Sequence, residues 1–417
     1  MPIDPATRPF GVIEGFYGDP WSQGERLACI DALGSWGANT YVWAPKSEPR
    51  HRDAWEEPFT DGEIEGFRAM AGRDGRVQVS VGLTPGDGAT VAAVVDKLAP
   101  ALAVTDGPVT VCFDDLPALA AADHHRDTVN GVAAATGRQV WLVPTHYAGT
   151  VGSPYLDRLH DGLDTAVTVM WTGQHVVTPT VTAADVAART AACGGRAPLV
   201  WDNVPVNDAM MAGHLHICPF TGRDVDAAGA SAGWLLNPML SMRASLPTIR
   251  SACAWWHGGD ALAAWDAEVD AQGLRLLAQA TAYPGDAHWP GDEPSTEWLE
   301  SVSAMPDTGD TDLDPWVDAA RRGARIALAA RSVRTSLDSA ERRTVRAVDG
   351  LGLLAVRDWL QLQSRTLGAG PRTRPVFTQG EDGRFAMENA AVEFTDSIPE
   401  REVRAALAAM ARAEGRP

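Results

Sequence analysis

The stretch VTVCFDD, residues 109–115, decides the fold class. Its first five residues form an almost continuous apolar run, which is typical of a strand buried on both faces of a parallel sheet. The run ends in two adjacent carboxylates, Asp114 and Asp115. Such neighbours repel each other, and each makes the other harder to ionise. A loop can hold such a pair merely for solubility or to cap the next helix, whereas an active site can use the repulsion to keep one carboxyl protonated near neutral pH.

Seven further apolar runs of the same kind recur at intervals of roughly thirty residues, and each is followed by a helical pattern. The runs cover residues 11–18, 40–45, 77–86, 139–147, 166–173, 198–203 and 233–238. Between two of them, Thr60 and Glu63 form a capping-box pattern that predicts the start of a helix. Eight strands alternating with helices over about 250 residues predict a (β/α)₈ TIM barrel. An open doubly wound sheet would place a glycine-rich phosphate turn after the first strand, where this chain has EGFYGDPW.

The barrel pattern ends with residues 241–256, which predict the last barrel helix. Residues 283–315 are rich in Pro, Gly, Asp and Thr, which is typical of a connection. Helical patterns then return, and Ser397 followed by Glu400 predicts the start of a final helix. We therefore predict three parts. They are a catalytic (β/α)₈ barrel over residues 1–256, an irregular connection with some helix over 257–314, and an α-helical C-terminal domain over 315–417, with an irregular insertion at 368–385.

Composition excludes several classes of function. The 417 residues carry 54 acidic and 35 basic side chains and a net charge of −19, which argues against nucleic acid or an anionic membrane surface as a partner. The five Cys are far apart and form no CxxC pair, so reduced thiols are expected. The N-terminal residues do not resemble a signal peptide and no apolar stretch is long enough to span a bilayer, so we expect a cytoplasmic protein.

Polar and aromatic residues follow the predicted strands, at the barrel end that carries the chemistry in this fold. They include Lys46, Asp114, Tyr147, Trp201 and Asn237. These residue types together suit a neutral, hydroxyl-rich ligand such as a sugar. A single Lys without an Arg cluster makes a phosphate ligand less suitable.

Two histidine-containing stretches are alternative candidate sites. His214, His216 and Cys218, in HLHICPF, are metal-ligating residue types, but a closed site needs four ligands and the sequence has no second cluster. His124 and His125, in DHHRD, are predicted to lie at the solvated start of a helix. We therefore predict no metal and no cofactor.

Seven stretches occur in a fixed order along residues 9–256: GVIEGFYGDPW, YVWAPKSEPRHR, FDD, PTHYAGT, VMWTG, VWDNVPVND and LLNP. In these stretches the chain resembles glycoside hydrolase family 84, the O-GlcNAcase-like β-N-acetylglucosaminidases. The resemblance implies a retaining exo-β-N-acetylglucosaminidase whose substrate is an N-acetylglucosamine-containing glycoconjugate or glycosylated protein. It also implies substrate-assisted catalysis, in which the 2-acetamido oxygen attacks the sugar's own anomeric carbon to give an oxazoline. The oligomeric state is not indicated.

The resemblance assigns different tasks to the two adjacent carboxylates. Asp114 would orient and polarise the acetamido N–H and must stay charged. Asp115 would be the general acid that protonates the leaving oxygen, and then the general base for water. Repulsion between the two groups pushes their titrations apart, as these roles require, although the macroscopic steps belong to the pair.

The resemblance also implies a set of substrate-binding residues. Tyr147 and Asn203 would hold the acetamido group, and Trp201 would form the wall behind it. The sugar hydroxyls would be met by Gly15, through its backbone, and by Lys46, Asp208 and Asn237.

Other functions remain open at this point. A hyaluronidase-like or other hexosaminidase would act on longer glycans, but closure of the pocket by Asp208 and Asn237 favours exo action. A non-catalytic sugar-binding barrel is disfavoured because Asp114, Asp115 and Tyr147 are all present. A metal-dependent barrel hydrolase would need an H-x-H pattern after the first strand, where this chain has EGFYG.

Overall fold

The computed structural model describes residues 7–86, 88–115, 121–283, 286–291, 293–338, 352–357, 371–373, 377–380, 384–387, 392–394 and 397–413. The chain forms two compact units. The first contains residues 1–210, 219–268 and 375–391, and the second contains residues 211–218, 269–374 and 392–417. The boundaries predicted from the sequence at residues 256 and 314 stay predictions.

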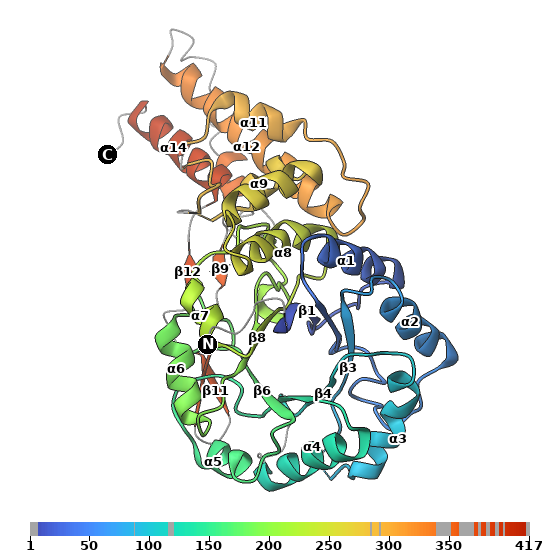
Figure 1. The fold of residues 1–417 in the computed structure, drawn as a ribbon. Coiled ribbons are helices and arrows are strands. Elements are labelled where there is room, and N and C mark those ends of the chain that lie inside the picture. The colour runs from blue at the N-terminus through green and yellow to red at the C-terminus, as the bar shows by residue number, and fades with distance from the viewer. Residues whose placement is uncertain are drawn as a thin grey trace. The chain divides into compact units, whose positions relative to one another are not determined.

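The first unit is built on a closed barrel of eight parallel strands in chain order, which confirms the predicted (β/α)₈ fold (Figure 1). The strands are β1 (Phe10–Glu14), β2 (Thr40–Trp43), β3 (Gln78–Leu83), β4 (Val109–Cys112), β5 (Val140–Val143), β6 (Val167–Trp171), β7 (Leu199–Asp202) and β8 (Gly233–Leu236). The helices around them are α1 (Gln23–Ser35), α2 (Asp61–Ala71), α3 (Val91–Leu102), α4 (Ala122–Thr136), α5 (Pro154–His160), α6 (Ala183–Ala192), α7 (Val225–Ala230) and α8 (Met242–Trp256), with a 3₁₀ turn at Ala209–Met211 before α7.

The strands of the barrel are buried on both faces. All residues of β4 and β5 are buried, as expected for strands between a packed barrel interior and surrounding helices. The parallel register aligns Val109 with Val140 and Cys112 with Val143, so neighbouring strands end at the same level. Side chains that follow the strands therefore gather at one mouth of the barrel.

Two buried carboxylates at strand ends belong to the scaffold. Glu14 accepts two hydrogen bonds from Arg26, each of 2.8 Å, and a third from the hydroxyl of Tyr41 at 2.6 Å. Asp202 forms a similar two-bond pair with Arg223, at 2.8 and 2.7 Å. These pairs tie Glu14 of β1 to Arg26 of α1, and Asp202 of β7 to Arg223, which precedes α7.

The start of α4 differs from the prediction. The helix begins at Ala122, and His125 is 1% exposed rather than solvated. Its ring stacks on Phe113 with 3.9 Å between centroids, and its Nδ1 lies 2.9 Å from the hydroxyl of Tyr155. Burial lowers the pKa of His125 to about 3, because the interior disfavours the charged ring. The prediction of a solvated histidine was wrong here because a neutral imidazole packs as a flat apolar group.

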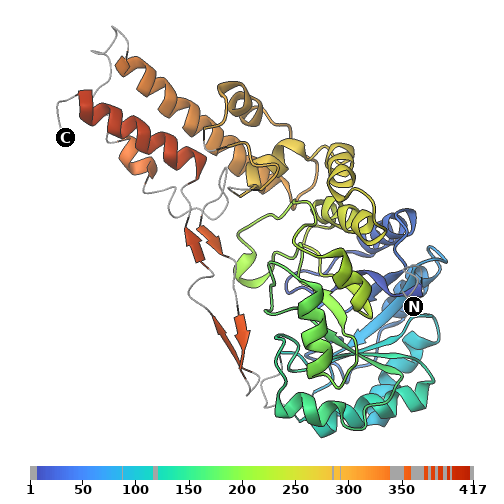
Figure 2. The same ribbon diagram turned by 60° about the vertical axis from the view of Figure 1, so that its left-hand side comes forward.

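The second unit is helical. Helix α9 (Ala261–Ala271) leads into it, and α10 (Arg275–Thr281) and α11 (Thr296–Ser303) occupy the region predicted as a connection. The long helices α12 (Asp314–Asp338) and α14 (Ile398–Ala413) lie side by side (Figure 2) and pack through Ala330, Val403 and Ala406. The backbone N–H of Glu400 donates to the Ser397 hydroxyl, which confirms the predicted start of the last helix. The helical pattern at 340–367 falls outside the described residues except for 352–357, which are helical.

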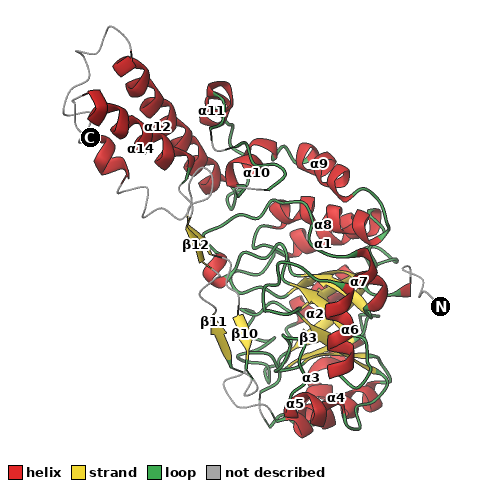
Figure 3. Cartoon of the chain, turned by 90° about the vertical axis from the view of Figure 1, so that its left-hand side faces the viewer, coloured by secondary structure: helices red, strands yellow, loops and turns green. Residues whose placement is uncertain are grey.

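The insertion predicted as irregular, residues 368–385, contains two short strands, β9 (Pro371–Thr373) and β10 (Phe377–Gln379). A third, β11 (Phe385–Met387), begins at its last residue, and a fourth, β12 (Val392–Phe394), follows it. Strands β10 and β11 form an antiparallel pair that belongs to the first unit (Figure 3), and β9 pairs with β12 in the second. Strands of three residues are too short for an alternating pattern to stand out in a sequence. Among the described residues, no helix has both the length and the apolar character needed to cross a membrane.

Candidate active site

Asp114 and Lys46 form a buried ion pair at the barrel mouth. Asp114 follows β4 and Lys46 follows β2, so parallel strands bring them together. The Nζ of Lys46 donates to Oδ2 of Asp114 at 2.6 Å, and the two residues are 4% and 5% exposed. Burial is the largest single influence and lowers the pKa of Lys46, but the charges of Asp114, Asp115 and other nearby groups together raise that pKa overall. Lys46 is therefore a permanent cation beside the carboxylate.

The second oxygen of Asp114 lacks a hydrogen-bond partner among the described residues, although it is buried. Burying an unpaired polar atom is costly, and native proteins satisfy most such atoms. An ionised carboxylate is an acceptor only. The atom Oδ1 of Asp114 is therefore suited to accept a hydrogen bond from an N–H or O–H group of a ligand.

The carboxylate of Asp115 is held by two tyrosine hydroxyls. Tyr147 donates to Oδ1 at 2.7 Å, and Tyr17 donates to Oδ2 at 2.9 Å. Asp115 has a φ of 53°, in the left-handed region that side chains rarely adopt, and it is exposed where Asp114 is buried. This backbone turn is the reason that two adjacent carboxylates have different surroundings.

Arg52 supports this arrangement from the loop after β2. It donates to the hydroxyl of Tyr17 at 3.0 Å and to the backbone carbonyl of Asp115 at 2.7 Å. Burial and the charge of Asp115 raise the pKa of Tyr17, so its hydroxyl stays a donor. Neither Tyr17 nor Arg52 was predicted from the sequence. Tyr17 lies two residues after Gly15 in EGFYG, which was a usable signal, but no local pattern indicates that Arg52 turns back to the mouth.

Trp201 and Gly15 pack in direct contact. A Cβ atom on Gly15 would lie 2.3 Å from Cζ2 of Trp201, so only glycine fits against this ring. The Nζ of Lys46 lies 5.3 Å from the centroid of the Trp201 ring. The indole N–H donates to Oδ1 of Asn203 at 3.0 Å, which orients the ring. The indole therefore forms a rigid wall close to the Lys46–Asp114 pair.

A chain of side-chain amides links β1, β7 and β8. Asn237 accepts from the backbone N–H of Gly15 at 3.2 Å and donates to Oδ1 of Asn203 at 2.9 Å. Asp208 accepts from the backbone N–H of Tyr17 at 2.7 Å, and burial raises the pKa of its carboxyl. Of the nine residues predicted from the sequence, Trp201 lies in β7 and the other eight follow barrel strands, and all nine are joined by direct contacts, by chain neighbours or through Tyr17.

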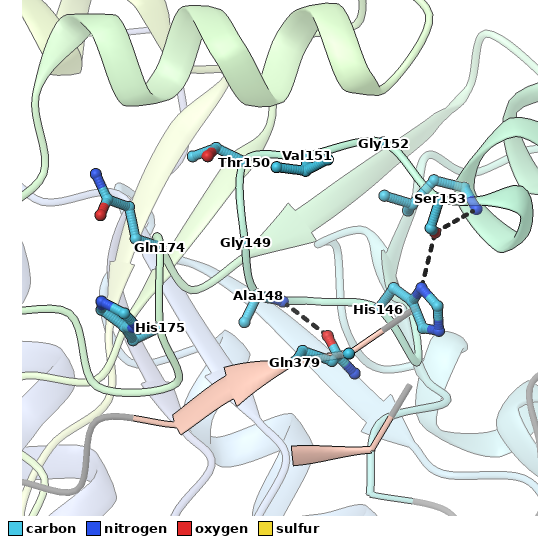
Figure 4. A pocket seen from close by; sticks show the side chains of 12 residues that line it. His146, Ala148, Gly149, Thr150, Val151, Gly152, Ser153, Gln174, His175 and Gln379 are labelled. Carbon is cyan, nitrogen blue, oxygen red and sulfur yellow. Dashed lines mark hydrogen bonds between the residues drawn. The ribbon is translucent and has the colours of Figure 1, made fainter. Parts of the chain in front are cut away.

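A cavity of about 250 Å³ lies next to Tyr147, between the ends of β5 and β6 (Figure 4). His146 and Ala148, the neighbours of Tyr147 in the chain, line it together with His175 and Gln379. The Nδ1 of His146 lies 2.8 Å from the hydroxyl of Ser153. The loop segment that carries Tyr147 therefore borders this cavity on one side.

The described part of the chain contains no group of three or more His, Cys, Asp or Glu residues placed to hold a metal ion. The rings of His214 and His216 lie near Tyr283, with 5.7 and 6.0 Å between centroids. The five cysteines form no disulfide.

A family model described as beta-N-acetylglucosaminidase matches residues 10–277, which is more than half of the chain. The chain belongs to this family. The family assignment predicted from the ordered motifs is thereby confirmed, and the match covers the whole barrel and the residues at its mouth.

Individual relatives agree with this family. The chain is 27% identical to the protein O-GlcNAcase of Rattus norvegicus over 272 residues, which is 59% of this chain but only 30% of that relative. Its fold is similar to that of an O-GlcNAc hydrolase mutant from Thermobaculum terrenum, with a TM-score of 0.78, 19% identity, and coverage of 98% and 97% of the two chains. A structure of CpGH84B is also similar, with a TM-score of 0.71, 19% identity, and coverage of 87% and 75%.

Proposed function

We propose that the chain is a retaining exo-β-N-acetylglucosaminidase that uses substrate-assisted catalysis. One observation carries this proposal: the buried carboxylate of Asp114 is paired with Lys46 through one oxygen and has its other oxygen unpaired among the described residues. The acetamido N–H of an N-acetylglucosaminide is a donor that this atom can accept a hydrogen bond from. The substrate is a terminal β-linked N-acetylglucosamine on a glycoconjugate or a glycosylated protein, which the relatives called O-GlcNAcase support.

In the first step, Asp114 accepts a hydrogen bond from the acetamido N–H and stabilises the positive charge that develops on this nitrogen. The acetamido oxygen then attacks the anomeric carbon. A C–O bond to the acetamido oxygen forms, the glycosidic C–O bond breaks, and the proton of Asp115 moves to the leaving oxygen. Lys46 pairs with Asp114 without the substrate, so this ion pair is in place before the transition state forms.

In the second step, Asp115 takes a proton from water while the water oxygen attacks the anomeric carbon and the oxazoline opens. The hydroxyls of Tyr147 and Tyr17 hold the carboxylate of Asp115 in place for this step. Tyr147 has one hydroxyl proton, so it donates either to Asp115 or to the acetamido group of the substrate.

The remaining residues bind the sugar. Trp201 forms the wall behind the acetamido methyl group, and Asn203 orients the acetamido oxygen. Lys46 has three donors, of which one binds Asp114, so it can also donate to a hydroxyl. Gly15, Asp208 and Asn237 meet the other hydroxyls. Asp208 and Asn237 hold the β1 loop through hydrogen bonds to Tyr17 and Gly15, which supports exo action over the hyaluronidase-like alternative.

The first test is release of nitrophenol from para-nitrophenyl N-acetyl-β-glucosaminide by the wild type and by Asp114→Asn. We expect turnover by the wild type and a loss of about 100-fold or more in the variant, the order expected when one group that stabilises the transition state is removed. The corresponding β-glucoside, which lacks the acetamido group, should not be hydrolysed. A folded wild type without turnover contradicts the proposal and favours the non-catalytic sugar-binding barrel, and equal turnover of both substrates contradicts substrate assistance.

A further inference from the structure

The β10–β11 hairpin contacts the loop that carries Tyr147, although more than 200 positions separate them in the chain. The side chain of Gln379, at the end of β10, donates to the backbone carbonyl of Thr145 and accepts from the backbone N–H of Ala148 at 3.3 Å. Figure 4 shows the second of these bonds. One amide thus binds the backbone on both sides of Tyr147, two residues before it and one residue after it.

A second hairpin residue contacts the Tyr147 side chain itself. The ring of Phe385, in β11, lies 5.1 Å from the ring of Tyr147, at an interplanar angle of 44°. Phe385 packs against the apolar cluster that contains Tyr147 and Trp201. Aromatic pairs at this separation attract each other beyond the area they bury. The hairpin therefore holds the ring as well as the backbone.

Tyr147 lies after the end of β5, in a segment without regular secondary structure, so strand hydrogen bonds do not fix its position. Its carbonyl accepts from the N–H of Thr172 at 2.9 Å, and its hydroxyl donates to Asp115 at 2.7 Å. A shift of the 145–148 backbone would move this hydroxyl away from Asp115. Contacts that hold residues 145–148 in place therefore also help to hold the Tyr147 hydroxyl against Asp115.

We propose that the β10–β11 hairpin is a positioning element of the active site, in which Gln379 and Phe385 aim the Tyr147 hydroxyl at Asp115. Neither residue is proposed to touch the reacting atoms. The contact itself is independent of the proposed function, whereas its effect on catalysis rests on that function. The catalytic site of the barrel is then completed by residues that follow the second unit's long helix in the chain.

The contact is tested by amide hydrogen exchange on the full chain, with Gln379→Ala and Phe385→Ala beside the wild type. Ala386→Ser is the matched control, since Ala386 is exposed and is the next residue of β11. We expect exchange in a peptide covering residues 145–149 to rise at least about fivefold in both variants, because the Ala148 N–H loses its acceptor or its support. It should stay unchanged in the control. Unchanged exchange in Gln379→Ala would overturn the proposal.

The effect on catalysis is tested by combining Phe385→Ala with Tyr147→Phe. Misplacement of a catalytic group by about 1 Å can cost up to about 100-fold, so we expect Phe385→Ala to lower kcat by about 10- to 100-fold. In the Tyr147→Phe background the same change should cost less than about twofold, because the hydroxyl to be positioned is already gone. Phe385→Tyr, which keeps the ring, should retain activity. Equal losses in both backgrounds would show a general structural effect and overturn the positioning role.

The two readouts separate this inference from the proposed function. If the wild type hydrolyses no N-acetylglucosaminide, the proposed function fails while the exchange measurement still decides whether the hairpin holds residues 145–148. If the wild type is active and the variants leave both exchange and kcat unchanged, only the positioning role fails. Melting temperatures within about 2 °C of the wild type would establish that the barrel remains folded in each variant.

Discussion

The Nζ atom of Lys46 lies 2.6 Å from Oδ2 of Asp114, and the exposed fractions of the two side chains are 2% and 7%. In this buried setting each charge depends on the other, since removing one partner leaves the other uncompensated. The pair uses only one oxygen of Asp114, and Oδ1 has no partner among the described residues. The ion pair thus compensates the buried carboxylate through one oxygen and leaves the other able to accept a hydrogen bond from a ligand.

Replacing Lys46 with Met should lower kcat/KM by about 100-fold or more. Without its cation, the buried carboxylate of Asp114 loses the partner that compensates and orients it. Steady-state kinetics on para-nitrophenyl N-acetyl-β-glucosaminide measure the loss. Lys46→Arg, which keeps the charge but not the compact ammonium, should lose less activity than Lys46→Met. Wild-type kcat/KM in Lys46→Met would contradict the pairing role.

The two carboxylates should respond differently to the leaving group. Asp115→Asn should lose most activity on substrates whose leaving group needs a proton, and much less on a dinitrophenyl glycoside, whose leaving group does not. Asp114→Asn should lose activity on both kinds of substrate, because the acetamido nitrogen must be stabilised whichever leaving group is used. Steady-state kinetics on the two substrates test these roles. Mild and equal losses in both variants would speak against them.

The sequence was sufficient to predict the barrel and its mouth. Strands buried on both faces read as apolar runs, and parallel strands must end at one side, so the residue pattern by itself placed side chains such as Lys46 and Asp114 together. The interactions of Arg52 and Gln379 could not be predicted in this way, because their partners are distant in sequence and no local pattern specifies a side-chain direction. Burial of His125 depends on packing with Phe113, which a helix-start pattern does not reveal.

Tyr17→Phe should lower kcat/KM by about 10-fold. The change removes the hydroxyl that donates to Oδ2 of Asp115 at 2.9 Å. The carboxyl is then held by Tyr147 alone and is less well placed to transfer its proton, and misplacement of a catalytic group costs activity. Steady-state kinetics on para-nitrophenyl N-acetyl-β-glucosaminide measure this loss. An unchanged kcat/KM would mean that Tyr17 does not position the acid.

His125 should make the fold less stable in mild acid. Its pKa in the folded chain is lowered from 6.5 to about 3, chiefly by burial, so below pH 6.5 the unfolded chain binds a proton that the folded chain excludes. The stability contributed by the neutral ring is therefore complete above pH 6.5 and is lost as the pH falls toward 3. One such proton changes the free energy of unfolding by up to about 1.4 kcal/mol per pH unit.

Urea unfolding of His125→Phe between pH 7.5 and pH 4.5 measures this contribution. The variant loses the hydrogen bond to Tyr155, so it should be less stable at pH 7.5, but its stability should fall less steeply with decreasing pH. His257→Gln is the control, since His257 is exposed and its loss should leave the slope unchanged. If the free energy of unfolding of His125→Phe fell with pH as steeply as that of the wild type, the pH dependence would come from other groups.

Gly15→Ala should abolish most activity while the barrel remains folded. The new Cβ would lie 2.3 Å from Cζ2 of Trp201, a distance that real Cβ atoms do not show, so the indole must move. The hydrogen bond from the indole N–H to Asn203 is then lost, and Asn203 is also bound by Asn237. The wall behind the acetamido group is displaced as a result. We expect kcat/KM to fall by about 100-fold, the cost of a misplacement near 1 Å. Gly75→Ala is the matched control, because a Cβ there would meet no atom within 4 Å, and it should keep wild-type kcat/KM. Equal kcat/KM values for the two variants would show that the close packing of Trp201 on Gly15 does not shape the pocket.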